Sequence, residues 1–279
     1  MIVDVHTHVF PDIIRENREN FFSGEEEFYS IYKDSKAKMV SYKELLNVMD
    51  EEGVDKAVIF GFPWNNIEYA KINNDYIIEA IENYPERFIG FACLNPLING
   101  ALEEIQRCVK FGLKGVGEIA FYSRDIDDEI IDKLKPIMEF CREKDIVFLI
   151  HTNEPVGHEY PGKVDMKLKN IYKFVKKYPE NKIILAHMGG GLFFYTLMKK
   201  EVEEVLKNTY FDTAAVPFLY KIEIYNILAQ FRIEDKILFG SDFPLIKPIR
   251  YFNDMEKSGA DKEILNKIKG LNAKKLFNL

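Results

Sequence analysis

Six side chains that can bind a metal ion stand at or just after the ends of short apolar runs in this 279-residue chain: His6, His8, Glu118, His151, His187 and Asp242. The chain has only five histidines in all. Imidazole and carboxylate groups are the ligands that Zn²⁺ and similar divalent ions take in proteins. One such residue alone would be more typical of a core hydrogen bond or a turn, but the joint pattern predicts a metal site.

The first apolar run holds two of these histidines, two residues apart. Side chains two apart in a strand point to the same face, so His6 and His8 are expected to lie together. We expect that face also to carry Asp4, and the opposite face, toward the helices, to carry Val3, Val5 and Val9. With an open coordination position, a metal held there would bind a water molecule and bring its pKa toward neutrality.

Glu118 has two interpretations. Strand alternation places it on one face with Val116 and Ala120, and if that face points into the barrel, its carboxylate needs a compensating positive charge. A direct bond to one metal ion, or a bridge between two, would supply that charge. In the alternative, Glu118 accepts a hydrogen bond from a metal-ligating histidine. The sequence thus predicts one or two divalent ions per chain, with zinc as the first choice.

Short apolar runs alternate with amphipathic runs along the whole chain. The pattern predicts eight strands, at 2–9, 56–62, 87–94, 114–121, 146–152, 182–187, 210–215 and 236–241. Helices are expected at 42–52, 68–83, 101–111, 129–143, 167–177, 194–207 and 220–231, with further helix to 277. Such alternation gives parallel strands, and eight units favour one (β/α)₈ barrel over 1–279. An open doubly wound sheet would usually carry a glycine-rich phosphate turn after its first strand, where this chain has His-Thr-His.

A long connection follows the first strand. Residues 10–40 hold several aromatic side chains among charged ones, and a connection of this length in a barrel is typical of a functional lid. The run Glu25-Glu26-Glu27 within it is expected to face solvent. Cations here and after later strands could bind an anionic substrate: Arg15, Arg18, Arg124, Lys163, Lys247 and Arg250. His158, in the loop after the fifth strand, is a weaker candidate for the same role.

Composition narrows the class of protein. The net charge is −7, which argues against broad binding to nucleic acid, and no apolar stretch is long enough to span a bilayer. Three cysteines without CxxC spacing fit reduced thiols, and no signal peptide precedes the first strand, so a cytoplasmic location is expected. The expected partner is a small molecule, and a homo-oligomer stays open.

These residues together resemble the amidohydrolase superfamily, in particular its "amidohydrolase 2" branch. Asp4-Val5-His6-Thr7-His8 is similar to the first-strand HxH motif, and residues 240–244, Gly-Ser-Asp-Phe-Pro, are similar to the segment after the eighth strand. The resemblance implies that His6, His8 and Asp242 hold the first metal and that Asp242 also shuttles a proton. His151 would be a ligand, and His187 a second-site ligand or an electrophilic catalyst.

Two groups within the superfamily suggest different reactions. TatD-like nucleases share a Gly-Glu-Ile segment with residues 117–119, which implies that Glu118 bridges two metals. Enzymes like aminocarboxymuconate-semialdehyde decarboxylase use one zinc for C–C cleavage. We predict a metal-dependent hydrolase of a small amide, ester, lactone or phosphoester. The alternative is a zinc-dependent non-oxidative decarboxylase of a small unsaturated or aromatic acid; a nuclease or a catalytically inactive barrel is a weaker hypothesis.

Overall fold

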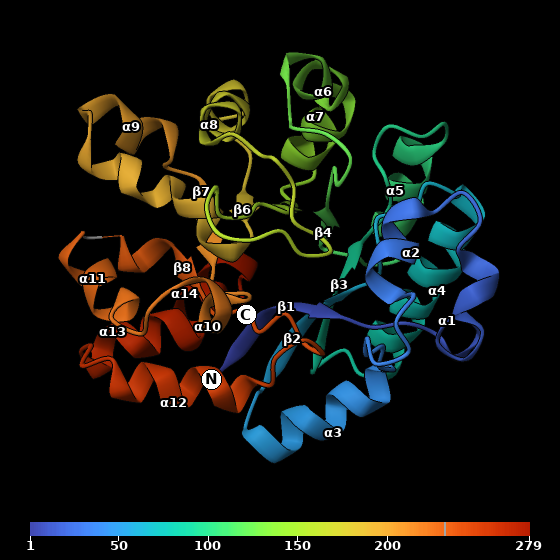
Figure 1. Cartoon of the computed structure of the whole chain (residues 1–279), viewed down its shortest axis with the longest axis horizontal. Helices are drawn as coiled ribbons and strands as arrows, with labels where there is room; N and C mark the ends of the chain where they lie inside the picture. The colour runs from blue at the N-terminus through green and yellow to red at the C-terminus, as the bar shows by residue number, and fades with distance from the viewer. Residues whose placement is uncertain (232) are drawn as a thin grey trace.

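One closed parallel sheet forms the centre of the molecule. The computed structural model describes residues 1–231 and 233–279, and its strands follow one another in the order β1 to β8 (Figure 1). They are Val3–His8, Lys56–Phe60, Phe88–Ala92, Gly115–Ile119, Val147–Ile150, Ile183–Leu185, Thr209–Asp212 and Ile237–Leu238. The last strand returns to the first, since the Val5 N–H donates to Phe239 O at 2.8 Å and the Asp242 N–H donates to His6 O at 2.9 Å. The predicted (β/α)₈ barrel is confirmed.

Helices cover the outside of this barrel. On the N-terminal half they are α1 Asp12–Glu16, η1 Arg18–Phe21, α2 Glu26–Tyr32, α3 Tyr42–Glu52, α4 Ile67–Asn83, α5 Ala101–Lys110, α6 Asp128–Lys133 and α7 Lys135–Glu143. On the C-terminal half they are α8 Leu168–Lys177, η2 His187–Leu197, α9 Lys200–Val205, α10 Val216–Leu219, α11 Ile224–Gln230, η3 Glu234–Lys236, α12 Pro248–Lys257, α13 Lys262–Asn266, η4 Lys267–Leu271 and α14 Asn272–Phe277. None of the described helices is long and apolar enough to cross a membrane.

Local sequence explains where some of these helices begin and break. Helix α3 begins at a capping box, in which Ser41 and Glu44 bind each other's backbone N–H groups, and it ends at Gly53 in the left-handed conformation. The single helix expected over 194–207 is replaced by η2 and α9. Residues 188–191 of η2 all have positive φ, which three consecutive glycines permit, so a regular α-helix does not start there.

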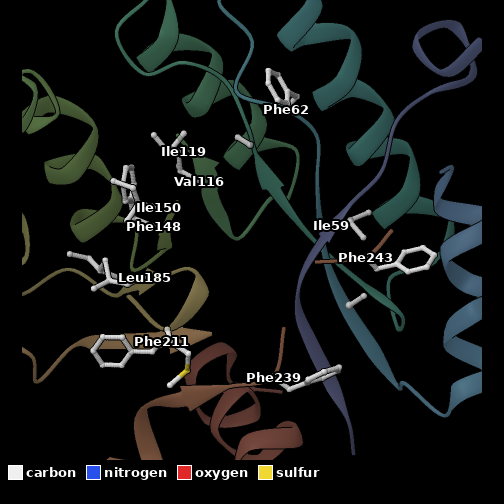
Figure 2. Close-up of a cluster of buried hydrophobic side chains, with 14 of the residues drawn as sticks. Ile59, Phe62, Val116, Ile119, Phe148, Ile150, Leu185, Phe211, Phe239 and Phe243 are labelled. Carbon is white, nitrogen blue, oxygen red and sulfur yellow. The ribbon is translucent and has the colours of Figure 1, made fainter. Parts of the chain in front are cut away.

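The strands separate two apolar layers. The outer layer packs between strands and helices, and Figure 2 shows Ile59, Phe148 and Phe211 in it. The inner layer fills the barrel with side chains such as Phe60, Leu149 and Ile184, and α14 adds Ala273 and Leu276 to it. Because successive strand residues alternate between these layers, membership of a layer tells which way a side chain points.

A bulge in β1 overturns the predicted facing of its residues. Asp4 pairs with Ala57 but Thr7 pairs with Ile59, so three steps of β1 match two of β2. Val3 and Val5 consequently lie in the inner layer, and the expectation that they face the helices with Asp4 beside the histidines is wrong. Val9 does lie in the outer layer, as expected.

A second bulge lies in β4. Val116 pairs with Phe148 and Ile119 pairs with Ile150, so one extra residue is inserted between them. Val116 and Ile119 both belong to the outer layer, whereas Glu118 reaches the histidines inside. The predicted shared face of Glu118 and Val116 is therefore wrong, and the insertion is what turns this carboxylate inward.

The segment 10–40 lies over the carboxyl end of the first strands. Its Phe28 and Tyr32 pack against Phe62 and Trp64, which follow β2. Glu25 is fully buried, contrary to the solvent-facing run expected there. Its carboxylate accepts from the N–H groups of Asn65 and Asn66, at 3.0 and 2.7 Å, just before α4 begins. These bonds anchor the segment to the second strand's connection.

Candidate metal centre

Six predicted donor side chains converge at the carboxyl end of the barrel. His6 Nε2 lies 3.6 Å from Glu118 Oε2 and 3.6 Å from Asp242 Oδ1. His8 Nε2 lies 3.7 and 3.5 Å from the same two oxygens. On the other side, Glu118 Oε1 lies 3.0 Å from His151 Nδ1 and 3.5 Å from His187 Nε2. Glu118 thus faces both groups of histidines, and Asp242 also lies close enough to His6 and His187 to share an ion with them.

The backbone brings these groups close by tight packing of β1 against the end of β8. A Cβ atom on Gly240 would stand 2.8 Å from His6 Cβ, so only glycine lets the two segments approach this closely. Two residues later, Asp242 has a φ of 59°, a left-handed conformation that turns its side chain back over β1. The convergence of the donors therefore depends on the backbone that follows β8 as well as on the donor side chains themselves.

Three histidines have their ring orientation set by an acceptor outside the cluster. His6 Nδ1 donates to Asp212 Oδ2 at 2.9 Å, His8 Nδ1 to Gly61 O at 3.0 Å and His187 Nδ1 to Ala214 O at 3.0 Å. Carboxylate and carbonyl oxygens only accept, so each Nδ1 carries the proton and each Nε2 presents a lone pair. All three lone pairs face the cluster, as metal ligation requires.

Asp212 is a residue that the sequence reasoning missed. It ends β7 and is fully buried. One oxygen accepts from His6, and the other accepts from the backbone N–H groups of His187 and Ala214, at 2.9 and 3.0 Å. Asp212 lies inside the strand predicted at 210–215, so the strand-end signal that identified the other donors did not point to it; only the structure ends β7 at this residue.

The electrostatics of the cluster favour a bound cation. Burial alone would raise the pKa of Glu118, yet His6 and His151 hold it well below its ordinary value. Burial would lower the pKa of His6, but Glu118 and Asp212 raise it well above. Against the effect of burial, His8, His6 and His187 lower the pKa of Asp242 to about 2. Without an ion, protonated histidines compensate these carboxylates; a bound divalent ion would take over that role and leave each histidine Nε2 free to bind it.

The donor atoms also fit a divalent ion in spacing. Ligand atoms about 2.1 Å from a tetrahedral ion lie about 3.4 Å apart. The four separations that join His6 and His8 to Glu118 and Asp242 are 3.5 to 3.7 Å. His6 Nε2 is buried and has no hydrogen-bond partner among the described residues. An unpaired buried nitrogen aimed at two carboxylates is explained by a metal ion between them.

His151 differs from the other three histidines. Its Nδ1 faces Glu118 Oε1 and lies 3.2 Å from His187 Nε2, while its own Nε2 is buried without a partner in the described chain. Since Glu118 accepts, His151 Nδ1 carries a proton in this arrangement. Glu118 therefore combines features of both predicted roles, with one oxygen among the possible ligands and the other accepting from a histidine.

In the described part of the chain, the predicted substrate-binding cations make their ion pairs and hydrogen bonds with groups other than the six donors. Arg15 pairs with Asp12 and Glu44, Arg124 with Asp127 and Glu129, Lys247 with Glu51 and Glu52, and Arg250 with Asp254. Arg18 donates to three carbonyl oxygens within 32–37. Lys163 binds the carbonyl oxygens of Val156 and His158 and pairs with Glu154, and His158 itself is exposed. Each cation is thus committed within its own part of the fold.

Comparison with known proteins corrects one prediction. The sequence matches the family described as Amidohydrolase over residues 3–279. It is 24% identical to a 2-amino-3-carboxymuconate-6-semialdehyde decarboxylase from Dictyostelium discoideum over 320 residues, which cover 91% of this chain and 88% of that protein. It is 26% identical to a gamma-resorcylate decarboxylase from a Polaromonas species over 297 residues, which cover 84% and 86%. These relatives are decarboxylases, so the predicted hydrolase is wrong and the decarboxylase alternative is the better one.

A solved structure shares the fold over the full length. The 5-carboxyvanillate decarboxylase of Novosphingobium aromaticivorans, crystallised with manganese and 4-hydroxy-3-methoxy-5-nitrobenzoic acid, superposes with a TM-score of 0.76 at 18% identity. The match covers 100% of this chain and 96% of that one. With the whole-chain family match and the cluster of donors, the resemblance drawn from the HxH motif is confirmed. The chain belongs to the amidohydrolase family, as a metal-dependent enzyme on a (β/α)₈ barrel.

Proposed function

We propose that the chain is a metal-dependent, non-oxidative decarboxylase of a small aromatic or unsaturated carboxylic acid. The observation that carries the proposal is the convergence of six metal-ligand side chains in a chain whose curated relatives cleave carboxylates from such acids. No redox group is required, because the reaction replaces a carboxylate on carbon by a proton and releases CO₂.

In this proposal His6, His8 and Asp242 hold a divalent ion, with Glu118 beside them. Glu118, His151 and His187 form a second group of donors that can hold another ion. A metal bound there would supply positive charge that fixes and polarises the substrate's anionic oxygens. Zinc and manganese both suit imidazole and carboxylate ligands, so both are candidates.

The chain's own residues would then position the acid and move the proton. The carbon that loses CO₂ must receive a proton from a nearby group, and Asp242 and His187 are the proposed carriers. Asp242 is the more open of the two carboxylates in the first group, with 14% of its side chain exposed against 3% for Glu118. It therefore has more room to approach a bound substrate.

The test is direct assay of carbon–carbon cleavage. Enzyme loaded with manganese or zinc is incubated with 2,6-dihydroxybenzoate and with 5-carboxyvanillate in D₂O. We expect CO₂ release and deuterium at the carbon that carried the carboxylate, with Asp242→Asn at least ~100-fold slower. Metal-replete enzyme that releases no CO₂ from either acid, nor from a wider panel of hydroxybenzoates, would overturn the proposal.

A further inference from the structure

Aromatic side chains line one side of the donor cluster. The rings of Phe62 and Tyr122 are stacked, with centroids 5.9 Å apart and planes 12° apart. Tyr122 lies 5.4 Å from the ring of His151, and Tyr32 meets Phe62 edge-on at 6.1 Å. Three separate segments supply this wall: the segment 10–40 and the connections after β2 and β4. A flat apolar wall beside a metal centre is suited to an aromatic ring.

Two hydroxyl groups on this wall lack protein partners. Within the described residues, neither Tyr32 nor Tyr122 uses its hydroxyl in a hydrogen bond, whereas the buried hydroxyls of Tyr42, Tyr178 and Tyr251 all donate to protein oxygens. Among the described residues, neither of the two oxygens is a fully buried polar atom without a hydrogen-bond partner. They are therefore reachable from outside, and a ligand can satisfy them.

Both hydroxyls are phenols, whose ordinary pKa of about 10 leaves them protonated near neutral pH. Burial, followed by the carboxylates of Asp242 and Glu118, raises the pKa of Tyr32. Burial, followed by Glu118 and then Tyr32, raises the pKa of Tyr122. Both phenol rings contact Phe62, and Tyr122 also contacts His151, so the two lie on the same side of the donor cluster. Each presents a neutral O–H donor, which an anionic oxygen of a ligand would accept.

The nearest candidate cations are already bound elsewhere. Arg18 Nη1 donates to the carbonyl oxygens of Tyr32, Asp34 and Ala37, and so fixes the end of α2 from which Tyr32 extends. Lys163 Nζ is held by two carbonyl oxygens and lies 3.4 Å from Glu154. A ligand oxygen on this side would therefore contact phenol hydroxyls. A second carboxylate on the ligand would also contact phenols and would find no free positive charge there.

We propose that Tyr32 and Tyr122 determine substrate specificity by donating hydrogen bonds to an anionic oxygen of a small aromatic monocarboxylic acid whose ring lies beside Tyr122. The inference rests on the proposed function and narrows its substrate to acids with a single carboxylate. Two neutral donors suit one shared negative charge, whereas a second carboxylate would be desolvated without a counter-ion.

The test uses binding, which does not depend on turnover. Manganese-loaded enzyme is titrated calorimetrically with salicylate and with 2-hydroxyisophthalate, which differs from it by one added carboxylate. We expect salicylate to bind at least ~10-fold more tightly. Tyr32→Phe and Tyr122→Phe should each weaken salicylate by about tenfold without changing metal content. Tyr29→Phe, on the exposed side of α2, is the matched control and should leave affinity unchanged.

The outcomes separate this proposal from the proposed function. Absence of salicylate binding, preference for the dicarboxylate, or unchanged affinity in both phenylalanine variants would overturn the specificity proposal even if the enzyme releases CO₂. Tyrosine-dependent salicylate binding without cleavage of any acid would uphold it and overturn only the decarboxylase assignment.

Discussion

Strands β1 and β4 each contain a bulge, whereas β2 and β5, which pair with them, continue into their other neighbours in unbroken register. The regular strands alternate strictly between the two apolar layers and supply packing. The bulged strands lose that alternation and carry His6, His8 and Glu118. These three donors are placed where the regular pattern is interrupted, because the extra residue turns a side chain that would have faced the helices into the barrel. His151, His187 and Asp242 instead follow the ends of β5, β6 and β8.

Among the tests of this comparison, removal of the metal should have the largest effect on activity and stability. Without the ion, the carboxylates of Glu118 and Asp242 lose their compensating charge. Dialysis against dipicolinate should abolish activity and lower the free energy of unfolding by about 4 kcal/mol if the free metal had been kept at about 1,000 times its Kd. Thermal melts and assays before and after added Mn²⁺ or Zn²⁺ measure both. Full activity of protein shown by elemental analysis to be metal-free would contradict the assignment.

Replacing Glu118 by glutamine tests the role of the carboxylate that the β4 bulge turns into the barrel. The variant keeps the size and one acceptor but loses the negative charge. If Glu118 bridges two ions, elemental analysis should find one metal equivalent fewer, and activity should fall at least ~100-fold. Unchanged metal content with mildly reduced activity would assign Glu118 the hydrogen-bonding role toward His151. Glu129→Gln, at an exposed ion pair, controls for loss of charge.

Gly117→Ala should break the β4 bulge itself. Its φ is 140°, and an added Cβ would stand 2.4 Å from Leu149 O. We expect a loss of about 3 kcal/mol in unfolding free energy together with weaker metal binding. Gly53→Ala is the control, because Gly53 also has a positive φ but has open space around it. It should cost about 1 kcal/mol and leave metal affinity unchanged. Equal metal affinity in the two variants would show that metal binding does not depend on the β4 bulge.

Asp212→Asn tests whether a residue on the regular strand β7 sets the ring orientation of His6 on the bulged strand β1. Asparagine can no longer accept on both oxygens, so His6 and the His187 backbone compete for a single acceptor. A reduction of 10- to 100-fold in metal affinity is expected, measured by competition with a chelating dye. Asp128→Asn, at a surface pair with Lys173, should have no effect. An unaltered affinity at Asp212 would show that His6 keeps its orientation unaided.

Ile59→Val gives the smallest expected effect and tests a regular strand in place of a bulged one. Ile59 is buried in the outer layer of the regular strand β2. Loss of one methylene there should cost about 1 kcal/mol in denaturant unfolding, with metal content and activity unchanged. A marked loss of activity would mean that packing in the outer layer of a regular strand also positions the donor side chains.

The sequence predicted the barrel and the set of six donors because both depend on features that recur. Strand and helix periods repeat eight times, and strand ends of one polarity meet at one end of a barrel. The facing of Asp4, Val5 and Glu118 failed because a bulge shifts every residue beyond it, and β1 carries no glycine to mark the insertion. Gly117 did mark the one in β4, but a glycine in a strand has several meanings.

Other features of the site could not be predicted because the partners are distant in the chain. Arg124 and Lys163 follow the right strands, and only the folded chain shows that nearby acids and carbonyl groups already bind them. Asp212 was overlooked because its partner His6 is 206 residues away. The reaction type was misjudged on Glu118 alone, since a glutamate near two histidine groups serves hydrolysis and decarboxylation equally well.

The burial of Glu25 has a kinetic consequence. This carboxylate joins the segment 10–40 to the backbone at the start of α4, a 17-residue helix whose N-terminus carries partial positive charge. Tyr32 lies on the same segment, so we expect any opening of the segment to require release of Glu25 from Asn65 and Asn66. The residence time of a ligand would then depend on a point remote from the metal ligands.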